Sequence, residues 1–140
     1  MKTWVWFAII SMIFAGFTSV IAKIGLTGIS GDLGLAIRTL FVFVFVLLFA
    51  WAVVPVSSLS QLTPHNWYWL GLSGVTTTLS WIFYYKALKD GEVSTIALID
   101  KGSIIVAVLL AVFILKEQLT LRVVMGGLLM IGGIVIIAKK

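Results

Sequence analysis

Asp100 and Lys101 are charged residues that lie inside a long apolar stretch, from Thr95 to Leu115. On insertion scales a charge at the centre of a bilayer costs about 2.5 to 3.5 kcal/mol, so ionisable groups in such stretches usually face a bundle interior or an aqueous cavity. Asp100 shares one helical face with three small residues, Ser103, Ala107 and Ala111. A face of small residues packs closely against other helices, so we expect Asp100 to point inward.

The expected partner of Asp100 is a basic residue from another helix. Successive residues of a helix diverge by about 100°, which makes Lys101 a poor partner. Lys23 and Arg38, at the inner ends of the first two apolar stretches, are better placed. Two interpretations stay open for Asp100: a proton or substrate site, and a buried ion pair that tethers helices. Lys101 itself is explained by snorkelling toward the near interface.

A polar and aromatic stripe runs along the third apolar stretch at helical spacing. Its members are Gly71, Gly74, Thr77, Thr78, Trp81 and Tyr85. Hydroxyl groups and aromatic faces bind small organic solutes, so one interpretation of the stripe is a cavity wall. The other is tight helix packing, with each hydroxyl bonded to its own helix.

The composition places this chemistry in a membrane. Of 140 residues, 61% are hydrophobic and 11% are charged, and the mean hydropathy is +1.20. So few charges cannot cover a soluble globule, which excludes a soluble enzyme, a nucleic-acid-binding protein and a disordered tail. The net charge of +5 instead indicates basic loops on the cytoplasmic side. We therefore expect the lipid bilayer, and no nucleic acid, among the partners of this chain.

The sequence offers few groups for metal binding or covalent catalysis. It contains no cysteine and a single histidine, His65. This composition excludes disulfides, thiolate metal sites and cysteine nucleophiles, and it leaves a metal cluster almost without donors. We therefore expect no enzyme activity, no catalytic residue, no metal site and no cofactor.

The apolar stretches predict five transmembrane helices, since a bilayer core about 30 Å thick needs roughly 20 apolar residues per helix. The expected spans are residues 4–22, 36–54, 67–85, 95–115 and 121–138. Pro55 ends the second span, and Thr120 can cap the fifth. Gly126 and Gly133 in the fifth span are interpreted as packing residues. The predicted fold class is all-α, with a single polytopic transmembrane domain over residues 1–140.

Basic residues predict the orientation of the five spans. Three lie on the N-terminal face, Lys2, Lys116 and Arg122, and six lie on the opposite face, Lys23, Arg38, Lys86, Lys89, Lys139 and Lys140. The expected topology therefore has the N-terminus outside and the C-terminus inside, in a multi-pass protein of the cell membrane. A cleaved signal peptide is the weaker alternative for the first apolar stretch, because that stretch is long enough to span the bilayer.

The string SWIFYYKALKDGEVSTIALIDKGSIIVAVLLAVFILKEQLT, followed by VVMGGLLMIGGIVII, resembles the EamA domain of the drug/metabolite transporter superfamily. The earlier segment AKIGLTGISGDLGLAIRTL is similar to the first loop of short, five-span members. By motif, the resemblance marks Arg38, Tyr84, Tyr85, Lys86, Asp100 and Lys101 as functional positions and Glu117 as a structural one. Most members have a proline in mid span four, where this chain reads Asp100 to Ser103, so substrate assignments from ten-span members do not carry over.

Members of that family are typically ten-span transporters made of two five-span halves in inverted topology. The resemblance implies that this chain is one such half, which pairs as a homodimer or with another five-span chain. It implies transport of a small solute or metabolite by alternating access, with Asp100 as the candidate for proton coupling. The substrate or proton pathway would contain Asp100, Lys101, Arg38, Thr77, Thr78, Trp81, Tyr84 and Tyr85.

Two other functions stay open at the level of the sequence. One is a non-transporting accessory subunit that packs against a larger membrane complex. The other is a lipid-carrier flippase, because short relatives in the superfamily have such a role. A polar stripe inside an apolar protein favours a solute carrier over an inert subunit.

Overall fold

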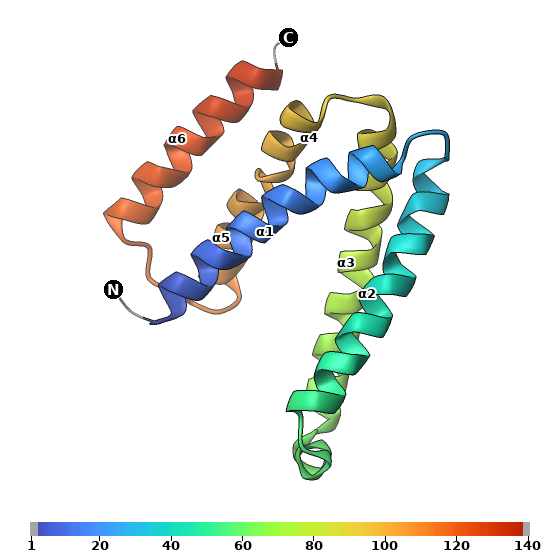
Figure 1. The fold of residues 1–140 in the computed structure, drawn as a ribbon. Coiled ribbons are helices and arrows are strands. Elements are labelled where there is room, and N and C mark those ends of the chain that lie inside the picture. Colours follow the sequence, from blue (N-terminus) through green and yellow to red (C-terminus); the bar gives the residue numbers. More distant parts are fainter. Residues whose placement is uncertain (1–2, 139–140) are drawn as a thin grey trace. The chain divides into compact units, whose positions relative to one another are not determined.

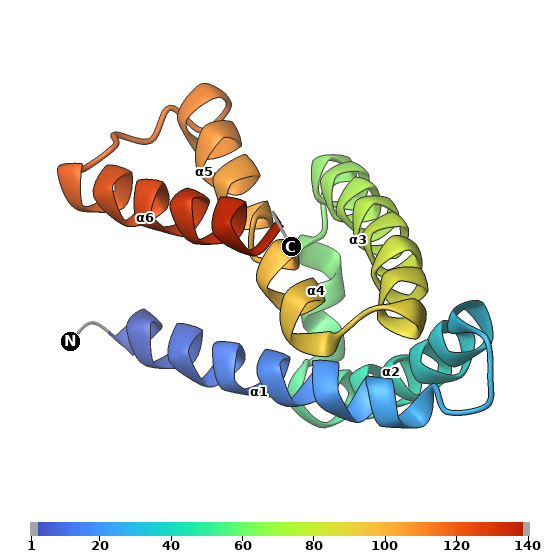
Figure 2. The ribbon, with the colours of Figure 1, turned by 90° about the horizontal axis from the view of Figure 1, so that it is seen from above.

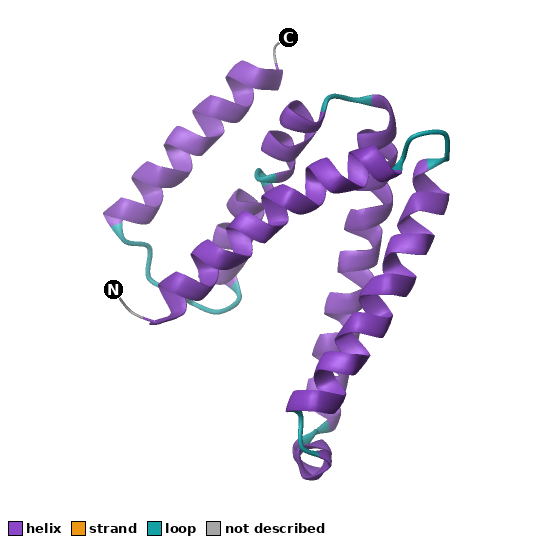
Figure 3. Ribbon diagram, in the orientation of Figure 1, coloured by secondary structure: helices purple, strands orange, loops and turns teal. Residues whose placement is uncertain are grey.

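The computed structural model describes residues 3–138, and this part of the chain is helical without any strand (Figures 1 and 3). The elements in chain order are α1 (Thr3–Gly25), α2 (Gly31–Val53), the 3-10 helix η1 (Val56–Gln61), α3 (Pro64–Asp90), α4 (Val93–Asp100), α5 (Ser103–Phe113) and α6 (Leu121–Ala138). The predicted all-α class is therefore confirmed.

Long apolar helices with exposed side chains identify a membrane protein. Within the described residues, three helical stretches are long and apolar enough to cross a bilayer: α1, α2 and the combined stretch Val93–Phe113. The helix α6 is apolar but shorter, and α3 carries the polar stripe. The buried apolar side chains in the described part of the chain are Leu26, Tyr85 and Leu88. Apolar surface of this extent is stable against lipid rather than water, so the chain is a polytopic membrane protein.

Side-chain caps explain where several helices begin. The Ser30 hydroxyl accepts a hydrogen bond from the Leu33 amide at 3.2 Å and so caps α2. The Thr120 hydroxyl accepts one from the Val123 amide at 3.4 Å, which confirms the predicted cap of α6. The helix α2 ends at Val53, shortly before the proline that the sequence indicated as its stop.

The chain forms two compact units. The unit named here the α2–α3 unit consists of residues 21–90, and its two long helices lie side by side (Figure 1). The second, named the α4–α6 unit, consists of residues 1–20 and 91–140, of which 3–20 and 91–138 are described. Within it, α6 packs against α4 and α5, and Figure 2 shows how the loop after α5 returns the chain along α6.

The apolar stretch predicted as the fourth span contains two helices rather than one. The helix α4 ends at Asp100 and α5 begins at Ser103. Between them the Gly102 amide donates to the Ile99 carbonyl at 2.8 Å, which is the tighter bonding pattern of a 3-10 turn. A Cβ on Gly102 would lie 2.9 Å from that same carbonyl oxygen. Glycine allows this break because it has no side chain. The hydropathy of the stretch does not predict the break.

Candidate functional site

Arg38 of α2 lies against two aromatic side chains of α3. Its guanidinium carbon Cζ is 4.3 Å from the centroid of the Trp81 ring and 5.8 Å from that of the Tyr85 ring. Trp81 and Tyr85 are four residues apart, so they share one face of α3. Both distances are in the range of cation–π attraction. The structure thus brings together three residues that the sequence placed on the pathway.

One nitrogen of this guanidinium is buried without a partner. The Nη1 atom of Arg38 has no hydrogen-bond partner within residues 3–138, although the side chain as a whole is half-buried. A buried donor without an acceptor is costly, and native proteins rarely leave one. Arg38 therefore has unused capacity to bind an anionic or other hydrogen-bond-accepting group.

Tyr85 is both a core residue and a neighbour of Arg38. Its side chain is 4% exposed, and its ring meets that of Tyr84 edge to face with centroids 6.3 Å apart. Tyr84 is half-buried. A substitution of Tyr85 would therefore disturb the core together with the Arg38 site, whereas Trp81 is half-buried and is better suited to separate the two effects.

Helix α2 approaches helix α3 closely, and this approach positions Arg38. A Cβ on Gly31 would lie 2.7 Å from the backbone oxygen of Tyr85, so α2 comes nearer to α3 than a side chain would allow. A Cβ on Gly34 would overlap the side chain of Leu26. Gly31, Gly34 and Arg38 have the spacing i, i+3, i+7, which puts the two glycines and the arginine on one face of α2.

Two lysines link the C-terminal ends of α1 and α3. Lys23 Nζ donates to the backbone oxygens of Leu88 at 2.6 Å and Lys89 at 3.0 Å. Lys89 Nζ donates in return to the backbone oxygen of Leu26 at 3.2 Å. Carbonyls at helix C-termini lack helical partners and carry the negative end of the helix dipole, so an ammonium group stabilises them. This arrangement was not predicted from the sequence. The feature that could have indicated it is a lysine in the last turn of each of the two helices.

An exposed ion pair adds a weaker link between α2 and α3. Lys86 Nζ lies 3.8 Å from Asp32 Oδ1, and the two side chains are 56% and 69% exposed. Exposed pairs of this kind contribute little to stability because water screens them. Lys86, which the resemblance marked as functional, therefore pairs with Asp32 at the surface and is not among the residues that contact Arg38.

The glycine and threonine part of the polar stripe is exposed in the α2–α3 unit, and the Thr77 and Thr78 hydroxyls bond to their own helix. Thr77 Oγ1 donates to the Ser73 carbonyl at 2.8 Å, and Thr78 Oγ1 donates to the Gly74 carbonyl at 2.9 Å. A Cβ on Gly71 or Gly74 would meet no other atom within 4 Å. The internal hydrogen bonds agree with the packing interpretation, whereas the open face agrees with a cavity wall.

Asp100 pairs with Lys101, which helical geometry had indicated to be a poor partner, and the expected pairing with Lys23 or Arg38 stays a prediction. The Asp100 Oδ2 and Lys101 Nζ atoms are 3.5 Å apart, with side chains 37% and 49% exposed. The prediction assumed a continuous helix, in which adjacent side chains diverge. Because α4 ends at Asp100, the long lysine side chain can turn back to its neighbour at the break.

The loop that follows α5 turns sharply at Lys116. This residue has a φ of 55°, the left-handed conformation that ends many helices. The next amide, of Glu117, donates to the Ala111 carbonyl at 3.2 Å. The backbone of Glu117 therefore helps to close the end of α5, and a structural role for its side chain stays a prediction.

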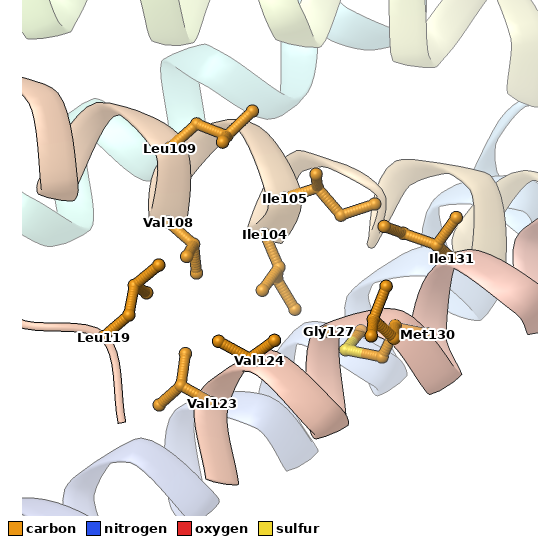
Figure 4. Close-up of a pocket in the computed structure, with 11 residues that line it drawn as sticks. Ile104, Ile105, Val108, Leu109, Leu119, Val123, Val124, Gly127, Met130 and Ile131 are labelled. Carbon is orange, nitrogen blue, oxygen red and sulfur yellow. The ribbon is translucent and has the colours of Figure 1, made fainter. Parts of the chain in front are cut away.

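An apolar pocket of about 190 Å³ lies between α5 and α6 in the α4–α6 unit. Figure 4 shows aliphatic side chains from the two helices that point toward each other across it. Its walls are formed by Ile104, Ile105, Val108, Leu109, Leu119, Val123, Val124, Gly127, Leu128, Met130 and Ile131. The walls are apolar, so the pocket suits a hydrocarbon group and offers no polar group to fix a solute.

Two predicted features of the chain stay open. A Cβ on Gly126 or Gly133 would meet no other atom within 4 Å, so the predicted packing of α6 at these glycines needs a partner surface. Three of the basic residues that predict the orientation, Lys2, Lys139 and Lys140, lie outside the described residues.

Among residues 3–138, no group of three or more His, Asp or Glu side chains could hold a metal ion.

Comparisons with known proteins cover nearly the whole chain. The model of the EamA-like transporter family matches residues 2–139. A Sinorhizobium protein described as "Uncharacterized transporter in cobO 3'region" is 31% identical over 137 residues, which are 98% of this chain and 97% of that relative. No solved structure matches. With its long apolar helices and this match, the chain is a membrane transporter and belongs to the EamA-like transporter family.

Proposed function

We propose that this chain carries a small solute across the cell membrane by alternating access, as one half of a dimer. The observation that carries the proposal is the family match over residues 2–139. The Sinorhizobium relative, described as a transporter, is matched over 97% of its own length. Transporters commonly pair two related halves around a substrate site near the bilayer midplane.

The polar face of α3, which is open within the α2–α3 unit, is the surface that the second half of the proposed dimer would cover. A Cβ on Gly71 or Gly74 would have no neighbour within 4 Å, and Thr77 and Thr78 are exposed. The two hydroxyls are bonded to their own helix, and a face of small residues such as Gly71 and Gly74 allows another helix to approach closely inside a membrane. A second five-helix chain, either another copy or a related protein, would supply such a helix and enclose a path.

The break between α4 and α5 is the proposed site of proton coupling. Asp100 and Lys101 form an ion pair at the end of a helix that stops inside an apolar stretch. Transporters use interrupted helices of this kind to bind substrates and coupling ions. Protonation of Asp100 would abolish its attraction to Lys101, so proton binding can be coupled to a movement at the break.

Replacement of Asp100 by asparagine tests this coupling. Asp100→Asn keeps the shape of the side chain but removes its charge and its titratable proton, so it should abolish transport driven by a pH gradient without preventing insertion. The measurement is uptake of isotope-labelled alanine, glutamate and choline by proteoliposomes with an imposed pH gradient. Lys101→Arg, which keeps the charge, should retain uptake.

The matched control is Asp90→Asn, because Asp90 is an exposed carboxylate at the end of α3. Its uptake should equal that of the unmodified protein. If Asp100→Asn protein transports normally but unfolds at a lower temperature, the ion pair is structural and the proton-coupling site lies elsewhere. A dimer that moves none of the three solutes would favour the accessory-subunit function.

The proposed orientation has the N-terminus outside and the C-terminus inside the cell membrane. It rests on the excess of basic residues at the inner helix ends, which include Lys23, Lys86 and Lys89. Two of these, Lys23 and Lys89, also bind backbone carbonyls at the ends of α1 and α3. Lysines with such contacts can remain in the interfacial region, where their charge is tolerated.

A further inference from the structure

We propose that Arg38, held against Trp81, binds the carboxylate of a small organic anion, and that this anion is the class of solute that the protein carries. The inference rests on the proposed transport function and names the substrate class of the Arg38 site. It is drawn from residues of the α2–α3 unit alone: Arg38, Trp81, Tyr85 and the adjoining face of α3.

The geometry of the guanidinium group favours a carboxylate ligand. An arginine that lies over an aromatic ring uses a face of its planar group, and its five N–H donors point outward in that plane. The cation–π contact, with Cζ 4.3 Å from the centroid of the Trp81 ring, holds Arg38 without satisfying its donors. Such a fork is preorganised to hold the two oxygens of a carboxylate.

Arg38 has no carboxylate partner among the residues of the α2–α3 unit. In this unit Asp32 pairs with Lys86, and this salt bridge does not include Arg38. Nη1 of Arg38 is buried, and no described residue accepts a hydrogen bond from it. The positive charge is therefore not neutralised by a carboxylate of this unit, and the buried Nη1 donor lacks an acceptor there.

The position of the charge in a membrane-spanning helix makes an anionic ligand favourable. Arg38 is seven residues after Gly31, the first residue of α2, which corresponds to about 10 Å along the helix. The helix α2 is one of the stretches that can span a bilayer. An uncompensated charge in a membrane-spanning helix is costly, less so near the interface than at the centre, and an anion of opposite charge lowers that cost. The site consequently discriminates by charge.

The surface next to the guanidinium suits the organic part of such an anion. Thr77 and Thr78 precede Trp81 by four and three residues, so they continue the same face of α3 away from Tyr85. Gly74, one turn further, leaves open space. An anion with its carboxylate at Arg38 would thus extend its organic part along hydroxyls and bare backbone. An organic cation would be repelled, because Arg38 already occupies the aromatic surface that attracts cations.

The chain offers a direct spectroscopic test, because it contains two arginines, Arg38 and Arg122. Full-length protein labelled with ¹⁵N-arginine in nanodiscs should give two side-chain Nε–H resonances, and Arg38→Lys assigns them. The probes are acetate, benzoate, benzamide and benzylammonium, of which the last three share one ring but differ in charge. We expect saturable shifts of the Arg38 resonance with acetate and benzoate, and none with benzylammonium.

Variants separate the site from general ionic effects. Arg38→Gln should weaken benzoate binding, measured by calorimetry, by at least about tenfold, since a charge-assisted hydrogen bond is lost. Arg122→Gln is the matched control and should bind benzoate like the unmodified protein. Trp81→Leu should also weaken binding, because Arg38 loses the ring that positions it.

Several results would overturn the proposal. They are an Arg38 resonance that is unmoved by both carboxylates, parallel and unsaturable shifts of both arginines, or equal responses to benzoate and benzylammonium. Saturable binding at Arg38 in protein that transports no solute would contradict the proposed transport function but leave the anion site in place. Solute uptake that persists without any Arg38 response would contradict the anion site alone.

Discussion

Gly31 shows how a single residue sets the geometry of the Arg38 site. A Cβ at this position would lie 2.7 Å from the Tyr85 carbonyl oxygen and 3.1 Å from its carbonyl carbon. The obstructing atoms belong to a helix backbone, which cannot rotate away as a flexible side chain can. The contact therefore depends on the absence of a side chain at residue 31, and Arg38 depends on the contact because both residues share a face of α2.

At this scale we predict that Gly31→Ala destabilises the protein by about 1 to 3 kcal/mol, the usual range for overpacking. The helices must separate to accommodate the methyl group, so the distance between Arg38 and Trp81 should increase. Detergent-solubilised protein unfolded by heat or by sodium dodecyl sulfate provides the measurement. The control is Gly16→Ala, because a Cβ on Gly16 would meet no atom within 4 Å. Equal stability of the two variants would contradict the close approach.

The helix α3 divides its length between two roles. Its C-terminal end carries Tyr85 and Leu88, which are buried, and contacts α2. Its middle carries the glycines and threonines of the polar stripe, and this part of the face is open within the α2–α3 unit. A helix with a packed end and an open polar middle suits a wall of a path that a second chain completes.

At the scale of this element we predict that Gly74→Trp blocks transport or disrupts the dimer, while the fold of the single chain persists. The indole would enter space that is empty in the α2–α3 unit, so it should not displace α2. Solute uptake by proteoliposomes and native mass in nanodiscs report the two outcomes separately. Gly74→Ala, which adds only a methyl group, should keep both properties. Normal uptake by the Gly74→Trp dimer would show that this face does not line the pathway.

The whole molecule has an orientation that the basic residues predict and that labelling can measure. The 27 residues of α3 extend about 40 Å, so both of its ends should project beyond a bilayer core of about 30 Å. Ser57, in η1 before α3, and Asp90, at its end, are exposed. The chain has no cysteine of its own, so a cysteine at either site is a unique label.

At the scale of the whole molecule we predict that Ser57→Cys reacts with an impermeant maleimide from outside the cell and Asp90→Cys only after permeabilisation. The reason is the excess of basic residues at the inner helix ends. The reverse accessibility would contradict the proposed orientation. Labelling of both sites from both sides would instead indicate a dual topology, in which two copies in opposite orientations reproduce an inverted pair.

The membrane class, the helical fold and the family could all be predicted from the amino-acid sequence. Long apolar runs with few charges leave a chain no stable choice in lipid except helices, because each backbone group must find its partner within its own segment. Local chemistry was also sufficient for the Thr120 cap of α6, since a hydroxyl before a helix acts on amides three residues away.

The contacts between side chains could not be predicted in the same way, because they depend on how the helices pack. Asp100 pairs with its neighbour Lys101 because α4 ends there, and the stop depends on the space around Gly102. Lys23 binds carbonyls of α3, and Arg38 lies on Trp81, because α2 and the end of α1 approach α3 closely. Such contacts join residues far apart in the chain, and hydropathy and helical periodicity describe only which face a residue occupies, not what lies opposite it.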